Sequence, residues 1–333
     1  MAPFASQLIR NRRVVISANK QTTYGTVLAD GALTHNLRFE GRNFPAAPEK
    51  EYFSDAQLAK GFPGASTRIE IQRRSSLQLS GLPVYDFLAG WLLAMAFGKV
   101  VTTGAGTPWT HTFTEDLSTT LAPVTTVYIE ETADEKYKMQ DVAIDSLRFS
   151  GGAIGPVLCD ATLRGSGRHL DGSMTPPALV DPVFILNNDA DILLGAPAGA
   201  TSIKERIRSW EINIGTPQED YRHPGSGLYA GFHRRGDLSP SVKLAVAAKD
   251  TDDIRTLLIS DTMQELQINI NSAAGAQLNF KFPNLKFRGV GGEDGQYIVW
   301  NIEADESSIF RIGAAERVEV VVINGQATYL VAA

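Results

Sequence analysis

The clearest hydrophobic pattern in the chain is a strand followed directly by an apolar helix, between residues 75 and 98. Apolar Leu77 and Leu79 alternate with polar neighbours, as in a strand that buries one face. Pro83 suits the first position of a helix, because its missing N–H would have no partner there, and Gly98 suits the end. Between them, apolar residues recur at helical spacing: Val84, Phe87, Leu88, Trp91, Leu92 and Met95. The pattern predicts one strand and one buried helix.

The same pattern occurs a second time, between residues 240 and 260. At one common offset, Val242 takes the place of Leu77 and Leu257 takes the place of Leu92. The flanking segments match in the same order: 50–62 with 218–232, and 144–152 with 282–292. We interpret the chain as a duplicated domain.

The remaining patterns predict a mainly β protein. Alternating apolar and β-branched residues predict strands at 33–41, 126–131, 136–151, 157–165, 208–215, 263–270, 277–289 and 296–305. We expect hairpins across 99–123 and across Asn324-Gly325, a favoured two-residue turn, and a strand-connecting turn at the glycine-rich 289–295. Segments 42–66 and 216–240 are too long for ordinary hairpin connections, which suggests functional loops.

These elements suggest two tandem β-sandwich or barrel domains, each with one packed α-helix. Residues 1–32 read as an N-terminal arm without an obvious packed element, and the Pro-rich residues 171–182 read as a linker. The two domains are then 33–170 and 183–333, a size typical of single domains.

Composition excludes some classes of function. The chain is 43% hydrophobic and 20% charged with a net charge of −6, so it can form a core and has no general attraction for nucleic acid. The single cysteine, Cys159, can form no internal disulfide and is expected to be buried. No signal peptide is apparent, and the apolar run at 87–97 is too short to cross a membrane, so we expect a soluble protein.

The sequence offers no constellation for catalysis. None of the five histidines has a partner at metal-binding spacing, and neither a nucleophile elbow nor a nucleotide-binding loop is present. The acidic spacing at 187–195 lacks the glutamate that a calcium loop needs. We therefore expect no catalytic residue, no cofactor and no metal, and we do not expect an enzyme.

Three short segments resemble the tail tube (major tail) proteins of long-tailed bacteriophages. QTTYGTVLADG at 21–31 is similar to the stretch that opens many of these proteins. PWTHTFT at 108–114 is similar to the segment after the family's helix, and TLAPVTTVYIEE at 120–131 is similar to a strand of the family. The segments are short, but their order also fits.

The resemblance implies a structural virion protein whose strands join neighbouring subunits into an inner barrel. Stacked rings of such subunits form a hollow tube through which DNA and the tape measure protein pass during ejection. A chain with two tube domains would form trimeric, pseudo-hexameric rings, with hexameric rings as the alternative. Tail terminator and distal tail proteins would be further partners. The protein would reside in the virion tail after assembly in the host cytoplasm, and the two-domain form favours a flexible, non-contractile tail, as in siphoviruses.

The aromatic residues of the two long loops are candidates for contacts between stacked rings. They are Phe44, Tyr52, Phe53, Phe62, Tyr221, Tyr229 and Phe232. The alternative is that each loop folds onto its own domain. In the arm, Arg10, Arg12 and Arg13 could dock on an acidic neighbour, or the terminus could simply be frayed. The net negative charge suits a lumen that does not hold phosphate.

A different class of protein also fits the β-rich pattern: a monomeric carbohydrate-binding or adhesion β-sandwich. It would need an exposed platform of aromatic rings, whereas the tryptophans fall mostly at core-like positions: Trp91, Trp109, Trp210 and Trp300.

Overall fold

The computed structural model describes most of the chain as β-structure with two α-helices. The described residues are 13–37, 49–54, 68–131, 134–179, 181–249, 253–272, 275–294 and 297–331. The prediction of a mainly β fold is confirmed.

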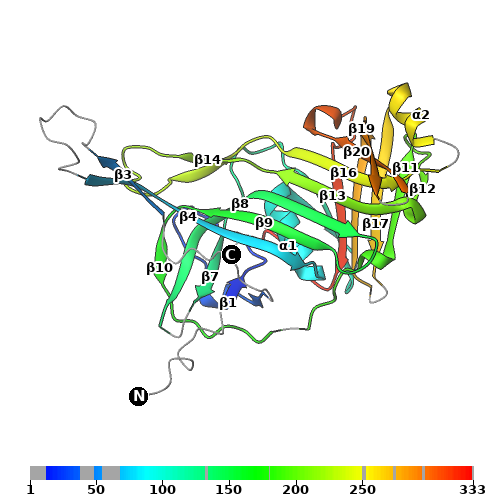
Figure 1. Cartoon of the computed structure of the whole chain (residues 1–333). Helices are drawn as coiled ribbons and strands as arrows, with labels where there is room; N and C mark the ends of the chain where they lie inside the picture. The colour runs from blue at the N-terminus through cyan, green and yellow to red at the C-terminus, as the bar shows by residue number, and fades with distance from the viewer. Residues whose placement is uncertain are drawn as a thin grey trace, which may run out of the picture.

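Among the described residues, the first half of the chain forms ten strands and one long helix, as Figure 1 traces. They are β1 (Arg13–Ile16), β2 (His35–Asn36), β3 (Glu49–Ser54), β4 (Arg68–Pro83), α1 (Asp86–Phe97), β5 (Gly98–Thr103), β6 (Trp109–Glu115), β7 (Thr125–Glu130), β8 (Lys136–Gly152), β9 (Leu158–Gly165) and β10 (His169–Asp171). The strands predicted at 126–131, 136–151 and 157–165 and the hairpin at 99–123 are confirmed.

The described part of the second half forms eleven strands and a short helix. They are β11 (Ala190–Gly195), β12 (Thr201–Ser202), β13 (Ile207–Gly215), β14 (Gln218–Tyr221), β15 (Phe232–Arg235), β16 (Ser239–Ala247), α2 (Asp253–Ser260), β17 (Gln264–Asn271), β18 (Gln277–Leu285), β19 (Arg288–Asp294), β20 (Tyr297–Ala304) and β21 (Glu319–Asn324). The helix predicted in 240–260 is present as α2.

Five local predictions are wrong. The helix begins at Asp86 rather than at Pro83, because Pro83 still pairs with Leu158 in the sheet. The turn expected at 289–295 lies largely within strand β19, which pairs with β20. Of the strand expected at 33–41, the described part forms only the two-residue β2.

The N-terminal region and the C-terminal hairpin account for the other two corrections. Residues 13–16, expected in an unpacked arm, form β1, whose Val14, Val15 and Ile16 are fully buried. No strand follows Asn324 in the described residues, so the hairpin expected there does not form. The Asn324 amide instead donates to the Tyr329 hydroxyl (2.8 Å), and β21 finds its partners in β6 and β18.

Two large sheets organise the fold. The first, which we call the long sheet, follows the order β19-β20-β16-β13-β8-β7-β1-β2, with β9 and β10 also paired to β8 and with β4 paired to β9 and β3. The second sheet follows the order β12-β11-β17-β18-β21-β6-β5. Strands β14 and β15 form a separate hairpin.

The two halves of the chain repeat the same strand order. The order β2-β1-β7-β8-β10 in the first half matches β12-β11-β17-β18-β21 in the second. Likewise β4-β9-β8 matches β16-β20-β19. The halves are joined in both sheets: residues 209–215 of β13 pair with 146–152 of β8, and β21 pairs with β6.

Helix α1 fills the space between the two sheets. It contacts β8 on one side and β5, β6, β18 and β21 on the other, and every residue from Phe87 to Phe97 is buried. Such a helix is apolar on all sides because no face of it meets water. It ends at Gly98, whose φ of 76° is the left-handed conformation that glycine adopts without strain, as the sequence predicts.

Candidate assembly surfaces

One face of the long sheet is polar along most of its length. In each strand the residues that face the core are apolar, such as Leu77, Leu79 and Cys159, and they alternate with small polar residues, as strand geometry requires. The outward residues in β4, β8, β9, β13, β16 and β20 include Gln78, Ser80, Ser146, Ser150, Thr162, Ser209, Asn213, Ser241 and Asn301. We call this surface the polar face.

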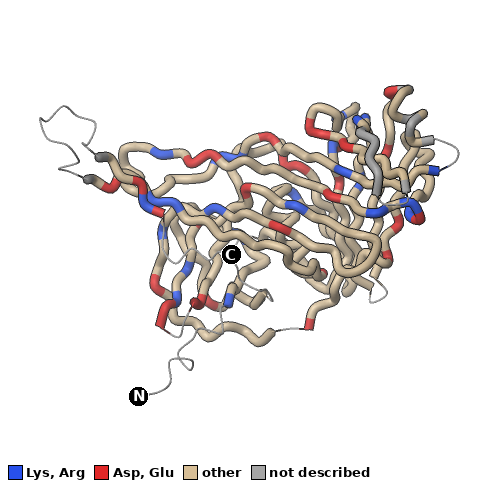
Figure 2. Tube along the Cα trace, viewed as in Figure 1, with Lys and Arg blue, Asp and Glu red and all other residues tan. Residues whose placement is uncertain are grey.

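Six charged residues cross the polar face in a single row of alternating sign, which we call the charge row. From β9 to β19 they are Asp160, Arg148, Glu211, Lys243, Glu303 and Arg288. Arg148 Nη1 lies 3.2 Å from Asp160, its Nη2 bonds Glu211 across the seam between the halves, and Lys243 Nζ lies 3.9 Å from Glu303. Glu211 lies opposite Lys243, and Glu303 lies opposite Arg288. Figure 2 shows acidic and basic segments interspersed along these strands.

The charges within the row affect one another. Burial by itself would raise the pKa of the Glu211 carboxyl, but hydrogen bonds from Asn213 and Arg148, together with the nearby Lys243, outweigh burial and lower that pKa. Glu211 is therefore a carboxylate held between two cations on neighbouring strands.

Two hairpins extend from the same end of the long sheet, on the left in Figure 1. The segments expected as long loops thus contain paired strands: β3 with residues 68–74 of β4, and β14 with β15. In the first hairpin, Phe53 lies opposite Ile69, and the side chains of Phe53, Ile69 and Ile71 are 50%, 54% and 46% exposed. Tyr52 is half-buried in β3, whereas the predicted contact residues Phe44 and Phe62 lie outside the described residues.

The second hairpin packs against the first half of the chain. The amide of Arg73 donates to the carbonyl of Leu228 (2.8 Å), and Tyr229 lies against the guanidinium groups of Arg73 and Arg168. Of the other predicted contact residues, Phe232 stacks on Tyr221 with ring centroids 4.4 Å apart, and Tyr221 is 49% exposed.

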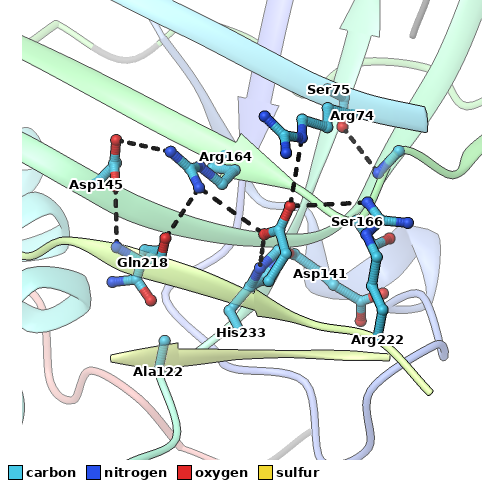
Figure 3. Close-up of polar contacts among 12 residues, drawn as sticks. Arg74, Ser75, Ala122, Asp141, Asp145, Arg164, Ser166, Gln218, Arg222 and His233 are labelled. Atoms are coloured by element: carbon cyan, nitrogen blue, oxygen red, sulfur yellow. Dashed lines mark hydrogen bonds and ion pairs between the residues drawn. The ribbon is translucent and has the colours of Figure 1, made fainter. Parts of the chain in front are cut away.

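Asp220 in β14 is the centre of the polar contacts that hold this hairpin in place. Its Oδ1 lies 3.0 Å from Nδ1 of the buried His233, and the guanidinium groups of Arg74, Arg164 and Arg222 lie 3.8–3.9 Å from its carboxylate. Figure 3 shows Arg74, Arg164, Arg222 and His233 converging from different parts of the chain.

His233 also contacts the first half of the chain. Its Nε2 lies 2.9 Å from the carbonyl oxygen of Asp141. Both ring nitrogens therefore lie within hydrogen-bonding distance of oxygen atoms. Burial would raise the pKa of the Asp220 carboxyl, but the hydrogen bond from His233 and the nearby guanidinium groups outweigh burial and lower it. Sequence reasoning missed this cluster, because its members are far apart along the chain.

Of the three arm arginines proposed for contacts, the structure describes Arg13. It begins β1 and lies opposite Glu130 of β7. Arg10 and Arg12 lie outside the described residues.

The described residues contain no group of three or more histidine, cysteine, aspartate or glutamate side chains that could hold a metal ion. Cys159 is fully buried, and burial raises the pKa of its thiol. In the part of the chain that the structure describes, no helix is long and apolar enough to span a membrane.

Comparison with known proteins agrees with the architecture. The chain finds no match among curated proteins. A family model described as phage tail tube protein matches residues 11–320, which is most of the chain. The chain therefore belongs to the phage tail tube protein family, and it is a structural component of the virion tail.

Proposed function

We propose that this chain forms rings through the edges of its long sheet, and that the rings stack into a tube through which DNA and the tape measure protein pass during ejection. The observation that carries this proposal is the seam between β8 and β13. Two halves with the same strand order meet there edge to edge. The chain thus contains one example of the junction that would recur between neighbouring chains.

The long sheet has two further edges at which this junction could recur. β19 ends the strand order, and residues 75–83 of β4 pair on one side only, with β9, among the residues that the structure describes. In the repeated order β19 occupies the place of β8, so it is expected to meet the beginning of the next chain's sheet. When two different edges of neighbouring chains join head to tail, the chains close into a ring if the rotation from one chain to the next permits closure.

The number of chains in the ring follows from the number of units in the chain. We propose two tube domains, 33–170 and 183–333, on either side of a linker at 171–182, supported by the repeated strand order. Three chains then supply six units. Native mass spectrometry of isolated rings distinguishes a mass of three 36.1-kDa chains from the alternative of six.

The polar face is proposed to line the lumen. It is rich in serine, threonine, asparagine and glutamine, whereas the opposite face of the same strands is occupied by the core. A lumen with few unpaired cations does not hold the phosphate backbone of DNA. In this arrangement the chain acts as a conduit and not as an enzyme.

Contacts between stacked rings are proposed to use the first hairpin. Phe53, Ile69 and Ile71 present apolar side chains on a projecting ribbon, where a monomer gains nothing by exposing them. Replacing Phe53 and Ile69 together by serine should leave rings that fail to stack, as seen by electron microscopy. The matched control is Leu117→Ser, at a residue that is 67% exposed outside the hairpin. Normal tubes from the hairpin variant would contradict this role.

The tube is proposed to have further partners at its ends and within its rings. Tail terminator and distal tail proteins would cap its ends, assembly would take place in the host cytoplasm, and the tail would be non-contractile. The arm arginines Arg10, Arg12 and Arg13 would contact a neighbouring subunit.

The rival, a monomeric carbohydrate-binding β-sandwich, lacks support from the tryptophans, because Trp91 and Trp210 are fully buried. Electron microscopy of the purified protein tests the two functions, since the tail tube function requires rings or tubes.

A further inference from the structure

The charge row places each of its cations between two carboxylates. Arg148 lies between Asp160 and Glu211, and Lys243 lies between Glu211 and Glu303. These two basic side chains remain 46% and 58% exposed, so they face solvent on the polar face.

The last cation of the row follows the same rule. Arg288 on the edge strand β19 lies opposite Glu303, and its guanidinium is 3.9 Å from Asp305. The side chain of Arg288 is 71% exposed. The pairing therefore extends to the free edge of the sheet.

The stability of the sheet does not require the ion pairs of the charge row. Exposed ion pairs contribute little to folding, and the outward residues that flank the row, such as Ser146, Ser150 and Asn213, are uncharged and small. A row of three cations without acidic partners would instead be a phosphate-binding track, because each exposed lysine or arginine that neutralises a phosphate releases a counterion.

We propose that the acidic members of the charge row serve to occupy these cations, so that a DNA backbone passing over the polar face finds no cation free to bind it. The proposal rests on the proposed placement of the polar face in the lumen. A phosphate that approached Arg148 would have to displace two carboxylates already in contact with it. The paired row carries no net charge, so it neither holds the polyanion nor repels it strongly.

The test compares preformed tubes of the wild type with tubes of the variant Asp160→Asn/Glu211→Gln/Glu303→Gln, which keeps the cations and removes their acidic partners. A short fluorescent DNA duplex is mixed with the tubes, and its co-sedimentation is measured at increasing salt. We expect the variant to retain at least about tenfold more duplex than the wild type at low salt, and to lose it between about 50 and 200 mM salt.

The control variant is Asp171→Asn/Glu205→Gln/Asp237→Asn, which removes the same charge at exposed residues outside the row. It should behave as the wild type. Equal retention by the charge-row variant and the control would overturn the inference, as would strong retention by the wild type. If the triple variant forms no tubes, Glu211→Gln alone carries the test, with a smaller increase expected.

The outcomes for this inference and for the proposed function are distinguishable. Wild-type protein that forms no rings or tubes overturns the proposed function and this inference with it. Wild-type tubes whose DNA retention is unaffected by the row leave the proposed function standing and overturn the inference alone.

Discussion

Replacing Asp220 by asparagine should loosen the second hairpin from the first half of the chain. The buried His233 then faces a neutral amide oxygen in place of a carboxylate. A hydrogen bond to a charged partner contributes about 1.5–3 kcal/mol and a neutral one about 0.5–1.5, so the exchange costs about 1 kcal/mol. The three arginines at 3.8–3.9 Å are partly exposed, and each adds a few tenths of a kcal/mol. We expect a loss of about 2 kcal/mol in the free energy of docking.

Hydrogen exchange measures this docking directly. The amide of Ala230 donates to the carbonyl of Ser166, and the amide of Arg235 donates to the carbonyl of Thr120, so both report contact with the first half. A loss of about 2 kcal/mol corresponds to exchange faster by about thirtyfold at these amides. Glu219→Gln, at the exposed neighbour of Asp220, should change nothing. Equal exchange in the two variants would refute the reasoning.

The same cluster predicts a dependence on pH. Because the folded-state pKa of Asp220 lies below its unfolded value of about 3.9, the carboxylate contributes stability that is fully present above that value. The contribution is lost as the pH falls through the lowered pKa. After correction for intrinsic exchange rates, the wild-type hairpin should lose protection in that acidic range, and the Asp220→Asn variant should lack this component.

Two further predictions concern close packing and the end of α1. Gly151→Ala would place a Cβ atom too close to the side-chain oxygen of Asn187 for a van der Waals contact, so it should destabilise the protein by about 1–3 kcal/mol in urea denaturation. Gly152→Ala, where the added Cβ atom would lie 4.0 Å from the carbonyl oxygen of Ile154, is the matched control; equal effects would contradict the packing argument. Arg235→Met removes the guanidinium that donates to the carbonyl of Phe97 at the end of α1. The free energy of unfolding should fall by about 1–3 kcal/mol, and the thermal midpoint should fall with it. An unchanged midpoint would contradict this role of Arg235.

The local elements with strong periodicity could be predicted from the sequence. The continuous apolar spacing from Phe87 to Met95 requires a helix buried on all sides, and Gly98 ends it because only a residue free of a Cβ adopts that conformation easily. The alternation in β4, β8 and β9 likewise follows from burying one face of a sheet. The order of these elements also carried the resemblance to tail tube proteins, which the family match confirms.

Other features depended on partners distant in the chain. The favourable turn at Asn324-Gly325 forms no hairpin, because β21 pairs instead with β6, a strand more than two hundred residues earlier. Residues 289–294 of the glycine-rich segment form a strand because β20 supplies their hydrogen bonds. Local propensity decides such segments only where no distant strand competes for the backbone.

The candidate surfaces were likewise determined partly by the sequence and partly by the tertiary structure. The sequence by itself determined which residues are polar, that two similar units follow one another, and that aromatic residues gather in 42–66 and 216–240. Only the tertiary structure decided that Glu211 meets Arg148 across the seam, that Asp220 faces three arginines, and that the second hairpin lies on the first half. The physical reason is that the repeat of side chains along a strand fixes which face a residue occupies, whereas strand pairing fixes which residues become its neighbours.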